Sequence, residues 1–242
     1  AQRLQALAAG LQIDAGQLAV ADLQEPESLR AAALSLRSAG VIDYVVCATG
    51  QQQQLPLAGQ TDAQIARALQ IDLAGPIHAA RAFLPVVEER GIIALMGGHA
   101  NGSIVLPYYT LDVAARAGLA GFCAATNREL ELEARDVRLC YTSPAPLQGT
   151  EQRVYTAAWS KLGARPATEE SVANFILGSL LARRTSAIMG WRPLLLTWLH
   201  GTLPPLGHVL ALRAVEQVTS ELEAPEPHTR RAAGPPPELE DP

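Results

Sequence analysis

Short apolar segments alternate with amphipathic helical segments along most of this chain, and this alternation limits the folds that it can adopt. The segments that we predict as strands cover residues 17–21, 41–47, 92–96 and 137–141. The predicted helices begin at Pro26 and at Thr61 and cover residues 76–89, 112–134 and 168–183. Strands joined by helices usually pair in parallel, with helices on both faces of the sheet. The sequence therefore predicts an α/β fold, a doubly wound parallel sheet.

Local signals support these elements. The runs 41–47 and 92–96 are almost continuously apolar, a pattern typical of strands that are covered on both faces. Thr61-Asp-Ala-Gln64 is a capping box, which begins a helix. Pro26 suits the first turn of a helix, and Gly91 suits a position just after the end of one.

The chain has 242 residues, of which 48% are hydrophobic, enough for one domain with a sizeable core. We assign residues 1–190 to the α/β domain, 191–223 to an apolar C-terminal extension, and 224–242 to a disordered tail rich in proline and acidic residues. Residues 193–212 contain no Asp, Glu, Lys or Arg, but prolines and glycines interrupt the run and disfavour a membrane span. A cover over a cleft, a subunit contact and a membrane-surface contact stay open for this extension.

Composition and charge exclude several classes of function. The net charge of −5 gives no electrostatic argument for binding nucleic acid. The three cysteines lie far apart and the histidines lack metal-site spacing, so we predict no disulfide and no metal site. No signal peptide is visible, and the expected location is the cytoplasm.

Over roughly residues 1–190 the chain resembles the short-chain dehydrogenase/reductase family, a Rossmann-fold family of oxidoreductases. Asp22-Leu23 follows a predicted strand where the family places an acidic residue beside the adenine. The runs 42–50, 71–75 and 91–98 resemble the family's strand ending in Asn-Asn-Ala-Gly, its Val-Asn-x-x-Gly segment and its run ending in Ser-Ser. Leu84-Pro85 and the loop 143–150, similar to the family's Pro-Gly-x-x-x-Thr loop, complete the order.

The resemblance also implies where the catalytic residues would lie, and this chain departs from the family there. The family's tyrosine, lysine, serine and asparagine correspond to Asp112, Arg116, Gly98 and Asp72. Gly98 has no hydroxyl group, and an ionised Asp112 can accept but not donate a hydrogen bond. Arg116 would lower the pKa of Asp112 and so keep it ionised.

Two other interpretations of this region stay open. Asp112 and Arg116 are four residues apart, so they could form an ordinary helical ion pair. Tyr109 is a candidate for a recruited phenol, and His99 is a candidate hydrogen-bond donor in place of the missing serine.

The resemblance implies NAD or NADP as the cofactor. The cofactor-binding positions would be Asp22, Leu23, Ala48, Thr49, Gly50, Pro144 and Ala145. The family's glycine-rich turn, which holds the pyrophosphate, is absent from the sequence. Either the N-terminal strand–helix–strand unit lies outside this sequence, or the protein lacks it. Because a true loss would leave sheet edges unpaired, we expect the first.

From these residues we expect a degenerate short-chain dehydrogenase/reductase-like protein, a pseudoenzyme with weak or no NAD(P) binding. The alternative is an active NAD(P)-dependent oxidoreductase that acts on a small carbonyl or alcohol substrate with a non-standard proton donor. The small residues between Ala114 and Gly121 also suggest a homodimer or homotetramer built from the helices near 112–134 and 76–89.

Overall fold

The computed structural model describes residues 17–51, 55–98, 109–147 and 166–203, together with residues 8, 10, 13, 14, 105, 209 and 213. The candidate donor His99 lies outside the described residues, as do the loop end 148–150 and the tail 224–242.

The centre of the fold is a parallel sheet of four strands in the order β1-β2-β3-β4. The strands are β1 (Tyr44–Cys47), β2 (Ile92–Met96), β3 (Arg138–Ser143) and β4 (Ser186–Ile188). Leu95 of β2 is in register with Cys47 of β1 and with Tyr141 of β3. All four carboxyl ends therefore lie at one edge of the sheet, and the predicted α/β fold with a parallel sheet is confirmed.

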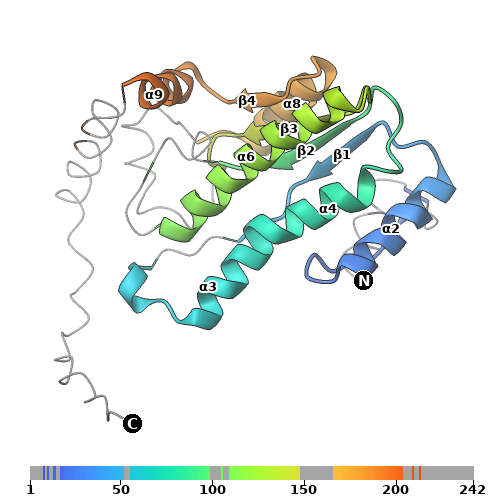
Figure 1. The fold of residues 1–242 in the computed structure, drawn as a ribbon, viewed down its shortest axis with the longest axis horizontal. Helices are drawn as coiled ribbons and strands as arrows, with labels where there is room; N and C mark the ends of the chain where they lie inside the picture. The colour runs from blue at the N-terminus through green and yellow to red at the C-terminus, as the bar shows by residue number, and fades with distance from the viewer. Residues whose placement is uncertain are drawn as a thin grey trace, which may run out of the picture.

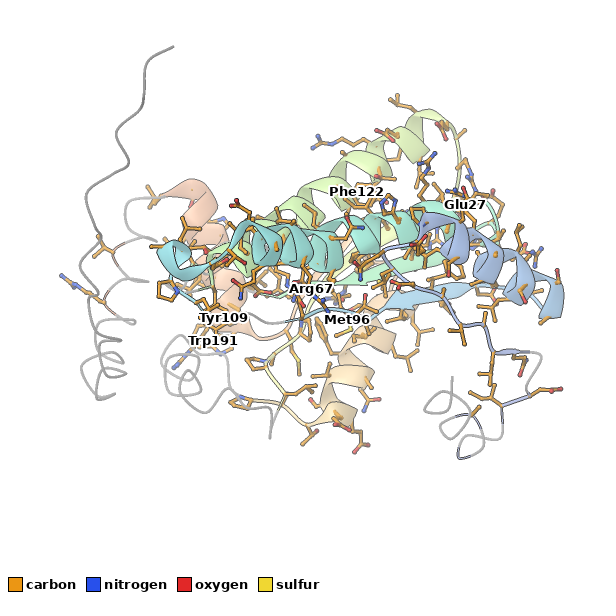
Figure 2. The ribbon with its side chains drawn as sticks, turned by 90° about the horizontal axis from the view of Figure 1, so that it is seen from below. Glu27, Arg67, Met96, Tyr109, Phe122 and Trp191 are labelled. Carbon is orange, nitrogen blue, oxygen red and sulfur yellow. The ribbon has the colours of Figure 1, made fainter. Side chains whose placement is uncertain are left out.

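Helices cover both faces of this sheet. α2 (Pro26–Ala39), α4 (Gly75–Phe83) and α6 (Thr110–Leu132) lie on one face, and α8 (Glu169–Leu181) lies on the other, as Figures 1 and 2 show together. Successive side chains of β2 point to opposite faces of the sheet, so β2 contributes to the hydrophobic core on each face. Ile93 and Leu95 pack beneath α4 and α6, whereas Ile92 and Ala94 pack against α8.

The helical signals in the sequence are confirmed at α2, at α3 (Asp62–Leu69) and at α6. Pro26 begins α2, and the capping box forms at Thr61, whose hydroxyl accepts a hydrogen bond from the Gln64 N–H. A π-helical turn, η3 (Gln70–Ala74), joins α3 directly to α4. The predicted helix 76–89 was too long, because α4 ends at Phe83 and turns carry the chain to β2.

Two strand predictions need correction. Residues 17–21 form no strand, because no described strand lies beside them to complete their hydrogen bonds. The sequence analysis also missed β4, which has only three residues, with Ser186 exposed, and carries too short a pattern to recognise.

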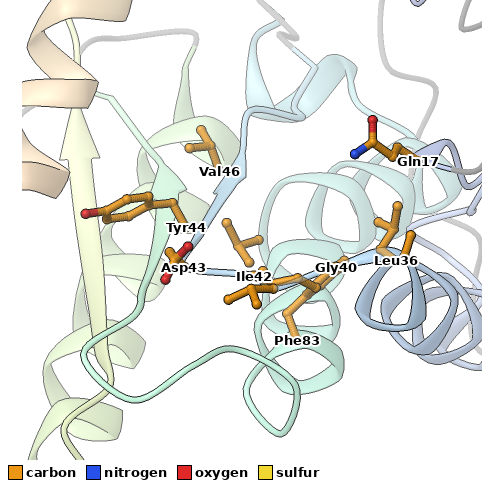
Figure 3. Close-up of a pocket in the computed structure, with 11 residues that line it drawn as sticks. Gln17, Leu36, Gly40, Ile42, Asp43, Tyr44, Val46 and Phe83 are labelled. Carbon is orange, nitrogen blue, oxygen red and sulfur yellow. The ribbon is translucent and has the colours of Figure 1, made fainter. Parts of the chain in front are cut away.

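β1 lies at an edge of the sheet and is covered on one face only, contrary to the prediction for residues 41–47. Tyr44 and Val46 are 47% and 44% exposed, whereas Cys47 is buried in the core beneath α2 and α4. A groove of about 450 Å³ follows the edge of β1 that no described strand pairs with. Figure 3 shows Gln17 on the opposite side of the groove from Tyr44 and Val46.

After β4 the chain forms α9 (Trp191–Thr202), beyond the carboxyl end of that strand (Figure 1). Gly190 precedes it with a φ of 97°, a conformation that favours glycine. None of the described helices is both long enough and apolar enough to span a membrane.

Asn127 connects α6 to the centre of the sheet. Its amide nitrogen donates to the Leu139 carbonyl and its amide oxygen accepts from the Leu139 N–H, each at 2.8 Å. We expect Asn127→Ala to lower the free energy of unfolding by about 2–4 kcal/mol, because two buried backbone groups lose their partner. Arg128→Ala, at the exposed neighbouring position, should change it by less than about 0.5 kcal/mol. Urea denaturation measures both, and similar losses would contradict the assignment.

Candidate functional site at the carboxyl ends of the strands

The residues that follow β1, β2 and β3 meet the start of α6 at one edge of the sheet. Gly50 follows β1, Gly98 follows β2 and Pro144 follows β3, while Asp112 and Arg116 lie in the first two turns of α6. Ligands of doubly wound sheets usually bind at this edge. We therefore take this edge as the candidate site.

Asp112 and Arg116 form an ion pair that is largely buried, not one on the helix surface. The side chains are 3% and 11% exposed. Arg116 donates from Nε and Nη2 to the same carboxylate oxygen, Asp112 Oδ1, at 3.2 and 3.0 Å. The i,i+4 ion pair that the spacing predicts is therefore confirmed, and it is buried because α6 packs this side against the sheet and η3.

Arg116 also binds the end of β2. Its Nη1 donates to the Met96 carbonyl at 3.2 Å, so three of the five guanidinium N–H groups have partners within the protein. A Cβ atom on Gly50 would lie 3.4 Å from Arg116 Nη2 and 3.1 Å from Asp72 Oδ1. Gly50 therefore lets the chain after β1 approach these two side chains closely.

Asp72 completes this cluster from the π-helical turn η3, where it is only 3% exposed. Its Oδ1 accepts a hydrogen bond from the Gln51 N–H at 2.8 Å. Burial raises the pKa of the Asp72 carboxyl, although the Gln51 N–H and the Arg116 guanidinium oppose this shift. Two carboxyl groups, Asp72 and Asp112, thus lie around one guanidinium.

Tyr141 of β3 holds the Gly97–Gly98 turn. Its hydroxyl donates to the Gly98 carbonyl at 3.0 Å and accepts from the Gly98 N–H at 3.1 Å. Burial raises the pKa of Tyr141 to about 12. A Cβ atom on Gly97 would lie 2.0 Å from the Tyr141 hydroxyl, whereas one on Gly98 would have no neighbour within 4 Å. Gly97 therefore allows Tyr141 to pack closely against the turn, whereas a side chain at position 98 would meet no neighbour.

Tyr109, the phenol considered for recruitment, immediately precedes α6 and is fully buried. Its carbonyl accepts a hydrogen bond from the Val113 N–H at 2.9 Å, within the first turn of that helix. Figure 2 marks its place in the fold. The Tyr109 ring therefore lies in the packed interior, close to Asp112 in the sequence.

The residues expected to bind the cofactor divide into two groups. Ala48 and Thr49 lie exposed after β1, beside Gly50, and Pro144 and Ala145 lie half-buried after β3. Asp22 instead organises the turn before α2, where its Oδ1 accepts from the Gln24 N–H and its own N–H donates to Ser28. Leu23 packs in the core, where a Cβ atom on Gly75 would lie 3.1 Å from its own Cβ.

Sequence reasoning missed three participants in this site: Gln51, Met96 and Tyr141. Gln51 and Met96 act through backbone groups, which carry no signal in the residue type. Tyr141 could have been suspected from its place in a predicted strand, but its contact with Gly98 depends on the register of β3 against β2.

Comparison with known proteins places this arrangement in a family. Residues 1–189 match the family described as Enoyl-(Acyl carrier protein) reductase, and the chain belongs to this family. The resemblance to short-chain dehydrogenases/reductases is thereby confirmed. Among curated protein sequences, none matches the chain.

Solved structures share the fold at low identity. A short-chain dehydrogenase from Burkholderia cenocepacia in complex with NADP has 19% identity and a TM-score of 0.65, covering 78% of this chain and 81% of its own. An enoyl-[acyl-carrier-protein] reductase (NADH) from Aquifex aeolicus has 19% identity and a TM-score of 0.64, covering 77% and 78%. A short chain oxidoreductase from Pseudomonas aeruginosa, bound to NADPH and described as containing an atypical catalytic center, has 23% identity and a TM-score of 0.65, covering 77% and 80%.

The two adjacent glycines give a matched pair of substitutions. Gly97→Ala should lower the free energy of unfolding by about 1–3 kcal/mol, because the new methyl group overlaps the Tyr141 ring. Gly98→Ala should be nearly neutral, because its methyl group meets no neighbour. Thermal and urea denaturation would measure the difference, and equal effects would show that Tyr141 does not hold this turn as described.

Asp72 should make the stability depend on pH. Because its pKa is raised in the folded protein, its contribution to stability is fully present below the unfolded pKa of about 3.8 and is lost as pH rises through the folded pKa. The Asp72→Asn variant keeps an acceptor for the Gln51 N–H, and it removes the loss of stability that comes from ionising a buried carboxyl group. We therefore expect the variant to gain stability relative to the parent as the pH rises above about 4.

Urea denaturation at several pH values checks this expectation, with Asp43→Asn at an exposed position as the control for the change of residue type. A difference between Asp72→Asn and the parent that does not vary with pH would contradict it.

Proposed function

We propose that this protein is a family member that does not reduce carbonyl groups efficiently and binds NAD(P) weakly or not at all. The observation that carries the proposal is the buried ion pair at the positions of the family's proton donor and its lysine. Asp112 and Arg116 are bonded to each other, and Arg116 is also bonded to the Met96 carbonyl.

This arrangement leaves the reaction without its usual groups. An ionised carboxylate cannot protonate an oxyanion, and the Asp112 carboxylate is already bonded to Arg116. Gly98 offers no hydroxyl to orient a carbonyl group. Positioned acid–base groups are worth about 10²–10⁴-fold in rate, so we expect at most weak turnover.

The residues present also fit a nicotinamide cofactor poorly. Asp72 Oδ1 and Arg116 Nη2 lie 3.1 and 3.4 Å from the position of a Cβ atom on Gly50, so the chain's own side chains occupy that side of the glycine. No catalytic step is therefore assigned to a bound nicotinamide here.

One observation favours a second candidate, an active NAD(P)-dependent oxidoreductase for a small carbonyl or alcohol substrate. The similar Pseudomonas structure is described as an oxidoreductase with an atypical catalytic center and holds NADPH. By analogy, a non-standard donor could serve in this chain, and Tyr109 is the phenol nearest in sequence to Asp112.

Steady-state assays separate the two candidates. Purified protein with NADH or NADPH and a panel of ketones and aldehydes should show reduction at least about 10²-fold slower than an intact family member. Robust turnover would overturn the proposal. Tyr109→Phe would then test the recruited phenol, with folding checked by circular dichroism because the ring is buried.

Calorimetry tests nucleotide binding directly. We expect no affinity for NAD(H) or NADP(H) in the submillimolar range. If such affinity is found, Gly50→Val should abolish it at this site, because the new side chain meets Asp72 and Arg116. Gly59→Val is the control, since a Cβ atom there has its nearest neighbour at 4.0 Å. Binding that survives at Gly50→Val would place the nucleotide elsewhere.

We also propose that the protein self-associates through the outer face of α6, next to α4. Ala115, Leu119 and Cys123 point into the core, whereas Ala114, Ala117 and Gly121 are exposed. Exposed small side chains let a facing helix approach closely, and a two-fold contact would use the same face of both subunits. Gly118 is not available in the same way, because Leu73 packs against it.

Light scattering with Gly121→Arg tests this interface. A Cβ atom on Gly121 has no neighbour within 4 Å, so the arginine should leave the fold of one subunit intact and convert the dimer to a monomer. Leu132→Arg, at an exposed position near the end of α6, is the control. A parent protein that is monomeric at micromolar concentration would contradict this proposal. A Gly121→Arg variant that is still a dimer would contradict it as well.

A further inference from the structure

α9 presents an apolar surface to solvent. Trp191, Leu194, Leu195 and Trp198 are 69%, 55%, 49% and 60% exposed. Their spacing of three, four and seven residues places them on one side of the helix. We call these four residues the α9 face.

The opposite side of α9 is apolar as well. Pro193 is buried and Leu196 and Leu199 are half-buried, where the helix packs near β4. Apolar sides of a helix are normally buried. In this protein one side is covered and the α9 face is open, which calls for a further apolar partner.

The hydroxyl groups of α9 do not depend on water. Thr197 Oγ1 donates to the Pro193 carbonyl at 2.9 Å, and Thr202 Oγ1 donates to the Trp198 carbonyl at 2.8 Å. Hydroxyl groups bonded to the helix backbone lower the penalty of leaving water. They also leave little for a protein partner to recognise, since protein interfaces usually exchange hydrogen bonds.

The charges around α9 favour an anionic surface. Residues 171–215 contain no Asp or Glu, although the whole chain has a net charge of −5. Arg192 and Arg213 flank the charge-free run 193–212. The Arg192 guanidinium lies over the Trp191 ring, 5.3 Å from its centroid, which places a positive charge at the level of an interfacial aromatic ring.

We propose that α9 binds in the plane of a membrane surface that carries anionic phospholipids. The α9 face enters the boundary between head groups and acyl chains, and Arg192 meets the lipid phosphates. Tryptophan and arginine suit this boundary because each has an apolar body and a polar end. The negative charge elsewhere on the protein is screened over about 8–10 Å at physiological salt, so the local arginines decide the contact. This inference does not depend on the proposed function.

Co-sedimentation of the full chain with vesicles tests the proposal. We expect binding to vesicles of phosphatidylcholine mixed with phosphatidylglycerol, and weaker binding to phosphatidylcholine alone. The double variant Trp191→Ser/Trp198→Ser should weaken binding to the mixed vesicles at least about tenfold, because it removes the largest apolar side chains of the contact. Arg192→Gln should weaken it about fivefold on mixed vesicles and little on phosphatidylcholine.

Leu132→Ser is the matched control, because Leu132 is 89% exposed on α6, away from α9, and its loss should leave vesicle binding unchanged. Circular dichroism checks that each variant is folded. A parent protein that does not sediment with either vesicle overturns the proposal, as does a double variant that binds like the parent. If light scattering instead shows an oligomer that only the double variant dissolves, with no vesicle binding, a second copy of the chain covers this face.

Discussion

The alternation of side chains along β2 and β3 is the constraint on which the rest of the fold depends. Ile93, Leu95, Leu139 and Tyr141 face α4 and α6, whereas Ile92, Ala94 and Cys140 face α8. A shift of either strand by one residue would exchange these two sets, so that the side chains that now face α4 and α6 would face α8, and the reverse. The same register places Tyr141 against Gly97 and Gly98, so the shape of the candidate site follows directly from the packing of the sheet.

Arg116 turns this scaffold into a site with unusual chemistry. Its guanidinium joins α6 to the end of β2 and lies close to Asp72 in η3. A buried ion cluster of this kind is often no more stable than well-packed apolar residues, because each charge loses its hydration. Burial raises the pKa of the Asp72 carboxyl even though the Arg116 guanidinium opposes this shift. The cluster is therefore better understood as holding segments in place than as a source of stability.

The sequence predicted those elements whose signals are local. Pro26 and the Thr61–Gln64 capping box marked helix starts, and the apolar run at 92–96 marked the central strand. The two strand predictions that failed depend on partners distant in sequence. Residues 17–21 have a strand-like composition, but no described strand lies beside them. The short strand β4 forms by pairing with β3. In the site, Asp112 and Arg116 were identified with the correct spacing, but their burial depends on how α6 packs. The contribution of Tyr141 depends on strand register, which one sequence does not reveal.

Among the described residues, two open features lie at opposite margins of the sheet. The groove follows the free edge of β1, and α9 follows β4, the last strand at the other end of the order. Between them, β2 and β3 are paired on both sides and covered on both faces, so the centre is complete without a partner. Unpaired edges and exposed apolar faces both favour association. Because the margins are separated by this complete centre, a strand that pairs with β1 and a surface that covers α9 would bind without competing for the same residues.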